Sequence, residues 1–184
     1  HSLNSVIHGF LNQGDHVLVC NFAHNSVIRP LEKLRKEKDL SFDRFKIDEN
    51  GTIDTDQLKS LIRPETKLLI LNHASNVIGV KAPLWQINKI CKENNIPILL
   101  DVTQSIVYED LEIEKWEIDF VAGTGHKTLL GPSGIGFLYV ANLKKLPSFM
   151  QGGSVGNPSL MTSHPPIAPF RFEAGTPNTT GIAG

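Results

Sequence analysis

A lysine and an aspartate occupy positions from which both side chains could act on one small ligand. Lys127 lies in "GTGHKTLLGPSGIG", a glycine-rich stretch between two apolar runs, and Asp101 ends the apolar run of "ILLDVTQS". Glycine occurs where a backbone turns sharply or approaches a ligand closely. A lone lysine in such a loop is either a solvated surface charge or an amine directed at a ligand, and the surrounding sequence decides between the two.

Polar side chains that can bind a ligand or transfer a proton follow each of four apolar runs. In chain order they are His24, His73, Asn76, Asp101, Gln104, Thr124, His126 and Lys127. One such group after one run would be unremarkable, but four runs in succession indicate a site.

The segments that carry these groups predict an α/β fold. Strands are expected at residues 16–20, 40–47, 67–72, 96–102, 119–124 and 134–140. Helical periodicity or helix caps occur between them, at residues 3–11, 26–38, 54–62 and from Pro83 onward. Mostly apolar strands that alternate with helices are typical of a mainly parallel sheet sandwiched by helices. Ligands bind such sheets beyond the carboxyl ends of the strands, where the polar groups lie.

An amine and a carboxylate at this edge suit pyridoxal phosphate (PLP). The cofactor needs an amine for a Schiff base and an acid beside its pyridinium nitrogen, and Lys127 and Asp101 supply these groups. Thr124, His126 and the backbone N–H groups of the glycine loop could hold the phosphate. His24 could stack on the face of the ring.

Other site classes fit the sequence poorly. His126 occupies the position where a nucleotide P-loop requires glycine, and "GPSGI" and "GIGFLY" fail as a nucleophile elbow and a dinucleotide fingerprint. The seven histidines show no metal-ligand spacing, so no metal site is expected. A net charge of -1 gives no reason to expect nucleic acid or an anionic membrane as a partner. No apolar stretch approaches the roughly 20 residues of a membrane span.

Several residues are expected to be structural. Cys20 and Cys91 read as small buried hydrophobes of a reduced, cytoplasmic protein. His73, taken alone, is expected to be a hydrogen-bonded core or loop histidine. The remaining histidines outside the candidate site are expected on the surface; they are His1, His8, His16 and His164.

Four motifs make the sequence similar to the class V aminotransferase superfamily, and within it to the cysteine desulfurase and selenocysteine lyase group. They are "LNHASNVIGV", "ILLDVTQS", "GTGHKTLLGPSGIGFLYV" and "RFEAGTPNTTGIAG", in the order of the family. The resemblance implies the large domain of a fold-type I PLP-dependent transferase, built on a mainly parallel seven-stranded sheet. Residues 1–184 would form this cofactor-binding domain incompletely, with an N-terminal segment and a C-terminal small domain outside the chain.

The resemblance also implies roles around the cofactor ring. Lys127 forms the Schiff base and moves protons at the substrate Cα. Asp101 pairs with the pyridinium nitrogen, and Gln104 binds the phenolic oxygen of the ring. His24 stacks on the ring and acts as an acid/base.

Further roles concern the phosphate and the substrate. Thr124 and His126 hold the phosphate, and Asn76 reaches the substrate carboxylate. Thr176 contacts the phosphate of the neighbouring subunit, which makes the active enzyme a homodimer with shared active sites.

The activity implied is release of sulfur or selenium from L-cysteine or L-selenocysteine, which leaves alanine and passes sulfur to an acceptor protein. A class V aminotransferase, another PLP-dependent lyase and a non-catalytic PLP-fold fragment are the alternatives. In relatives a phosphate-binding "GTT" turn precedes the position of His1, and a mobile-loop cysteine and a substrate-binding arginine follow that of Gly184. Residues 1–184 alone are therefore expected to be inactive.

Overall fold

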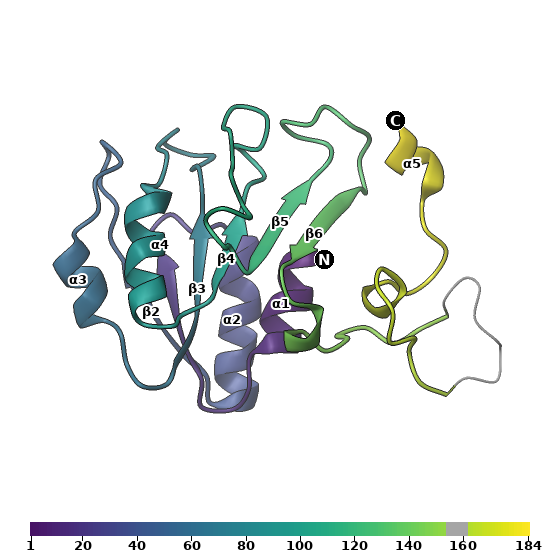
Figure 1. Cartoon of the computed structure of the whole chain (residues 1–184), viewed down its shortest axis with the longest axis horizontal. Helices are drawn as coiled ribbons and strands as arrows, with labels where there is room; N and C mark the ends of the chain where they lie inside the picture. Colours follow the sequence, from purple (N-terminus) through teal and green to yellow (C-terminus); the bar gives the residue numbers. More distant parts are fainter. Residues whose placement is uncertain (154–161) are drawn as a thin grey trace.

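The computed structural model describes residues 1–153 and 162–184, and one mixed sheet organises them (Figure 1). Within these residues the sheet has six strands, where the family resemblance implies seven, in the order β2-β1-β3-β4-β5-β6. The strands are β1 (His16–Cys20), β2 (Ser41–Phe45), β3 (Thr66–Asn72), β4 (Ile98–Asp101), β5 (Phe120–Thr124) and β6 (Gly136–Val140). The first five are parallel and β6 is antiparallel to β5, so the expected mainly parallel sheet is confirmed.

Helices cover both faces of the sheet (Figure 1). The α-helices are α1 (Ser2–Phe10), α2 (Asn25–Lys38), α3 (Thr55–Ser60), α4 (Leu84–Glu93) and α5 (Thr179–Ala183). Alternate residues of β1 face opposite ways: Val17 and Val19 pack with α1 and α2, whereas Leu18 and Cys20 pack with α3 and α4. Burial on both faces explains why the central strands are apolar at nearly every position.

Local signals in the sequence place the helices. The Asp54 carboxylate accepts hydrogen bonds from the backbone N–H groups of Asp56 (3.1 Å) and Gln57 (2.9 Å) and so caps α3. The buried side of α4 consists of the four residues expected from the periodicity: Leu84, Ile87, Ile90 and Cys91.

The turn between β5 and β6 brings the glycine-rich stretch to the carboxyl edge of the parallel strands. Residues 125–135 form this loop, closed by hydrogen bonds from Gly125 N to Ile135 O (2.8 Å) and from Gly131 N to Gly125 O (2.8 Å). A Cβ atom on Gly136 would lie 2.9 Å from the carbonyl oxygen of Gly123, so only glycine allows the two strands to approach this closely.

The described residues beyond β6, 141–153 and 162–184, have little regular structure. They include the short 3₁₀ turns η1 (Leu143–Lys145) and η2 (Phe170–Phe172) before α5. A Cβ atom on Gly181 of α5 would lie 2.8 Å from Ile135 Cδ1, so α5 packs against the 125–135 loop. In residues 1–153 and 162–184, no helix combines the length and apolar character that crossing a bilayer requires.

The expectation that His16 lies on the surface was wrong, because β1 runs between β2 and β3 and the side chain is fully buried. Its Nδ1 lies 2.8 Å from Thr66 Oγ1, which also accepts the backbone N–H of Arg63 (2.8 Å). Thr66 can therefore donate its hydroxyl hydrogen to Nδ1. The neutral ring then carries its hydrogen on Nε2. This nitrogen lies 3.3 Å from Asp43 Oδ2, but the two groups are not aligned for a hydrogen bond. Burial, with the charge of Arg63, lowers the pKa of His16.

This lowered pKa predicts a loss of stability in acid. The folded state keeps His16 neutral while the unfolded chain takes up a proton near pH 6.5, so the free energy of unfolding falls as pH drops below about 6.5. One histidine contributes a slope of up to about 1.4 kcal/mol per pH unit. His16→Gln should flatten the slope measured by urea unfolding between about pH 5 and pH 8. The control substitution His1→Gln, at an exposed histidine, should leave the slope unchanged. Equal slopes in the two variants would contradict the assignment of the acid destabilisation to His16.

Candidate active site

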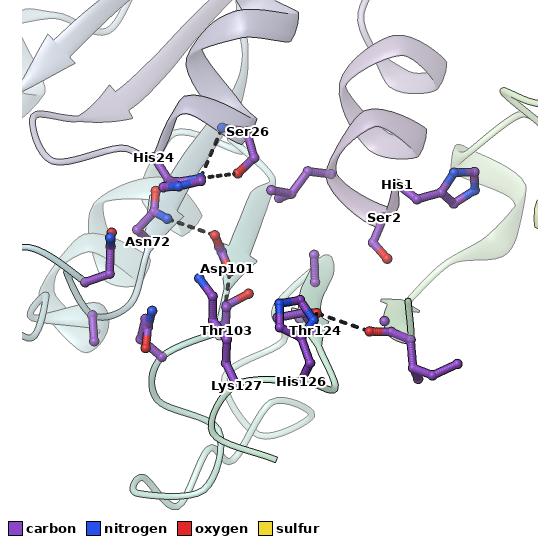
Figure 2. Close-up of a pocket in the computed structure, with 18 of the residues that line it drawn as sticks. His1, Ser2, His24, Ser26, Asn72, Asp101, Thr103, Thr124, His126 and Lys127 are labelled. Atoms are coloured by element: carbon purple, nitrogen blue, oxygen red, sulfur yellow. Dashed lines mark hydrogen bonds between the residues drawn. The ribbon is translucent and has the colours of Figure 1, made fainter. Parts of the chain in front are cut away.

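A pocket of about 460 Å³ opens at the carboxyl ends of β3, β4 and β5, beside the start of α2 (Figure 2). It is lined by seven of the eight residues expected at the site: His24, Asn76, Asp101, Gln104, Thr124, His126 and Lys127. The eighth, Thr176, is exposed and does not line this pocket. Figure 2 shows Lys127 and His126 extending from one loop toward the middle of the pocket, where Asp101 lies.

Asp101, the last residue of β4, is buried and held by two hydrogen bonds. Its Oδ2 accepts from Asn72 Nδ2 (2.8 Å), and its Oδ1 accepts from the backbone N–H of Thr103 (3.0 Å). No ion pair with Asp101 occurs among the described residues. A carboxylate has about four acceptor positions, so Asp101 can still accept a hydrogen bond from a cationic ligand.

The loop that carries Lys127 is attached to the turn that follows Asp101. Thr128 Oγ1 donates a hydrogen bond to the carbonyl oxygen of Thr103 (3.2 Å). The Lys127 carbonyl accepts from the backbone N–H of Leu130 (2.9 Å), which closes a turn directly after the lysine. These bonds fix the backbone position of Lys127 relative to Asp101, although the two residues lie in different loops.

His24 caps α2, and its hydrogen bond with Ser26 determines which ring nitrogen remains available to a ligand in the pocket. Its Nδ1 accepts from the backbone N–H of Ser26 (3.2 Å) and lies 2.8 Å from Ser26 Oγ. Because Nδ1 is an acceptor, the neutral ring carries its hydrogen on Nε2. His24 can therefore offer an N–H donor at Nε2.

His126 has the opposite arrangement. Its Nδ1 lies 2.9 Å from Thr124 Oγ1, and the Thr124 hydroxyl donates to the carbonyl oxygen of Ile135 (3.1 Å). A hydroxyl has one hydrogen, so Nδ1 must donate to Oγ1 and the neutral ring has a bare Nε2. His126 gains a second donor only by taking up a proton, and the imidazolium then forms a charge-assisted hydrogen bond to an anion.

Pocket residues that were not expected from the sequence include Ser26, Asn72 and Thr103. Ser26 holds His24, and the other two hold Asp101. Asn72 is paired in register with Asp101, a relation between two strands that the sequence of neither one reveals. A polar residue at the end of an apolar strand, next to a strand that ends in an acid, is the signal that could have identified it.

His73, Cys20 and Cys91, which were expected to be structural, lie outside the pocket, whereas His1, expected simply on the surface, lines it. His73 is buried with its Nδ1 2.9 Å from Ser105 Oγ, and burial lowers its pKa. Cys20 and Cys91 are free thiols, and burial raises the pKa of each to about 12. Neither thiol is therefore a nucleophile near neutral pH.

Comparison with known proteins identifies relatives over almost the whole chain. Residues 1–184 match the family described as Aminotransferase class-V. A protein named cysteine desulfurase from Serratia proteamaculans is 36% identical over 185 residues, covering 98% of this chain and 45% of that protein. The chain thus spans less than half the length of this curated relative.

Solved structures share the fold. CsdA, a cysteine desulfurase from Escherichia coli in an S-sulfonic acid form, gives a TM-score of 0.85 at 28% identity, covering 98% of this chain and 47% of CsdA. A C-DES mutant with glycine covalently linked to its PLP cofactor gives a TM-score of 0.80 at 25% identity, and the match covers 95% of this chain and 48% of the C-DES chain. The cystine C-S lyase C-DES in complex with its product, cysteine persulfide, gives a TM-score of 0.80 at 26% identity. This match covers 95% of this chain and 49% of the C-DES chain.

The family match extends over every residue of the chain, and the similarity to the Serratia protein extends over nearly all of them. The chain therefore belongs to the class-V aminotransferase family.

Proposed function

We propose that this chain is the cofactor-binding part of a PLP-dependent cysteine desulfurase, which releases sulfur from L-cysteine and leaves alanine. The observation that carries the proposal is the convergence of Asp101, Lys127, His24 and His126 on one pocket. The desulfurase relatives support the same activity, and the PLP-linked C-DES structure supports the same cofactor.

The donor set fits PLP. The buried Asp101 has acceptor capacity for the N–H of a pyridinium ring and no ion pair among the residues described. Lys127 offers a primary amine from the opposite loop, where an aldehyde carbon would meet it. His126, in its protonated form, offers a donor to the phosphate, and Thr124 supports that ring. When bound, the cofactor supplies an electron-withdrawing ring that stabilises negative charge at the substrate Cα.

The chain's own residues would divide the remaining work. Lys127 would hold the cofactor through its amine at the aldehyde carbon and would accept the substrate Cα proton on Nζ. His24 stacks on the ring and donates or accepts a proton at Nε2. Gln104 donates to the phenolic oxygen of the ring, and Asn76 binds the substrate carboxylate.

The sulfur needs an acceptor thiol. A thiolate attacks the substrate sulfur, the carbon–sulfur bond breaks, and its electron pair stays on Cβ, which takes up a proton to become the methyl group of alanine. Cys20 and Cys91 are too deeply buried to be that thiolate. We propose a thiol outside residues 1–184, from which the sulfur passes to an acceptor protein.

Other reactions of the same pocket give different products. L-selenocysteine would yield selenide by the same steps. A lyase that resembles C-DES would instead form cysteine persulfide from cystine, and an aminotransferase would give a keto acid. A non-catalytic fragment would bind PLP without turnover. We propose a cytoplasmic location, on the ground that both cysteines are free thiols.

Lys127→Ala in the PLP-loaded full-length protein should abolish the visible absorbance of the lysine-bound cofactor. Sulfide and alanine production from L-cysteine should fall by at least about 100- to 10,000-fold, because the proton acceptor is lost. Lys144→Ala, at an exposed lysine of η1, is the matched control and should retain both. A visible band in Lys127→Ala would refute the assignment, and pyruvate or cysteine persulfide as the main product of the unaltered protein would favour an alternative reaction.

His126→Ala should weaken binding of PLP but not of pyridoxal, which lacks the phosphate. The loss of one charge-assisted hydrogen bond predicts about 10- to 100-fold weaker PLP binding. Titration of apoprotein with each compound, followed by quenching of tryptophan fluorescence, measures both affinities. Equal weakening for the two compounds would show that His126 acts on the ring and not on the phosphate.

We also propose a homodimer in which Thr176 contacts the phosphate in the partner's pocket. Thr176 is exposed and lies outside its own pocket, and the following helix packs against the 125–135 loop. A mixture of Lys127→Ala and Thr176→Val proteins, unfolded and refolded together, should form hybrid dimers with one intact site. Their sulfide production should exceed that of either variant refolded alone. Additive activities, or a monomer by light scattering, would argue against shared sites.

A further inference from the structure

Three buried polar side chains form a line across the carboxyl ends of three adjacent strands. Cys20 ends β1, Asn72 ends β3 and Asp101 ends β4, and these strands are neighbours in the sheet. Cys20 Sγ lies 3.9 Å from Asn72 Oδ1, and Asn72 Nδ2 lies 2.8 Å from Asp101 Oδ2. The exposed fractions of the three are 0%, 6% and 7%, so water has little access to these contacts.

The orientation of the Asn72 amide follows from its two neighbours. The pKa of Cys20 is raised to about 12, so its sulfur keeps a hydrogen and acts as a weak donor to Oδ1. Asp101 needs a donor, which only the NH₂ group of Asn72 supplies. The reversed amide would set a carbonyl oxygen against a carboxylate and an NH₂ group against an S–H.

An amide is chemically distinctive at this position because it donates a hydrogen bond without adding charge. A lysine or arginine here would neutralise Asp101, and an apolar residue would leave Oδ2 without its donor. Asn72 stabilises the ionised carboxylate and leaves its full negative charge for the ligand.

We propose that Asn72 is a positioning residue that orients the Asp101 carboxylate toward the pyridinium nitrogen of PLP, with Cys20 fixing the amide. This inference rests on the proposed function, because it assumes that PLP occupies the pocket. It predicts that Asn72 controls PLP affinity.

Asn72→Leu, which keeps the branching at Cγ but has no donor, should weaken PLP binding about 10- to 100-fold in fluorescence titrations of apoprotein. Loss of the donor leaves Asp101 Oδ2 without the hydrogen bond that orients it, so the carboxylate is held less well against the ring nitrogen.

Two further variants separate positioning from folding. Asn72→Thr suits a strand and keeps a hydroxyl donor, so it should restore most of the affinity. Asn21→Leu removes a structural asparagine that bonds both the N–H and the carbonyl of Ile47 (3.0 Å each). It should lower stability without changing PLP affinity. Asn72→Ala, with less bulk than leucine, replaces Asn72→Leu if that variant does not fold.

An unchanged PLP affinity in the leucine or alanine variant would overturn the positioning role. If Lys127→Ala still lost the visible band in that case, the proposed function would stand. Failure of the unaltered protein to bind PLP would overturn the proposed function and this inference together. Equal losses in Asn72→Leu and Asn72→Thr would reduce Asn72 to a packing residue.

Discussion

The buried charge of Asp101 is the constraint on which the rest of the site depends. A carboxylate removed from water is costly unless hydrogen bonds or a counter-charge compensate for the lost hydration. Asn72 and the Thr103 backbone supply two hydrogen bonds, and no ion pair with Asp101 occurs among the described residues. The charge is therefore stabilised enough to persist but is left uncompensated on the pocket side, which is the condition for holding a cationic ring nitrogen.

Sheet topology turns that local condition into a site. The parallel order β1-β3-β4-β5 sends four strand ends to one edge, and the antiparallel return through β6 adds the loop with Lys127. The Thr128–Thr103 hydrogen bond then joins this loop to the turn after Asp101. A displacement of one of these loops would therefore displace the other. The distance between the Lys127 amine and the Asp101 carboxylate thus depends on backbone contacts more than on the long lysine side chain.

Local patterns predicted most of the fold, because strands, caps and apolar helix faces depend on neighbouring residues; Asp54 and the buried side of α4 are examples. Seven of the eight residues predicted for the site line one pocket, because residues that follow parallel strands are placed together at the carboxyl edge of the sheet. What sequence reasoning missed depends on contacts between distant segments. His16 is buried because β2 and β3 flank it, and Asn72 meets Asp101 only through the register of β3 and β4.

Hydrogen-bond direction could not have been inferred either, and it changes how the two pocket histidines are understood. The sequence suggested different roles for His24 and His126 but not their hydrogen-bond directions, and in the structure the first accepts at Nδ1 whereas the second donates there. The neutral ring of His24 thus keeps an N–H at Nε2, whereas His126 must be cationic to offer one. These directions suit the proposed roles of proton exchange for His24 and anion binding for His126, and the difference arises from the Ser26 backbone N–H in one case and the Thr124 hydroxyl, which donates to Ile135, in the other.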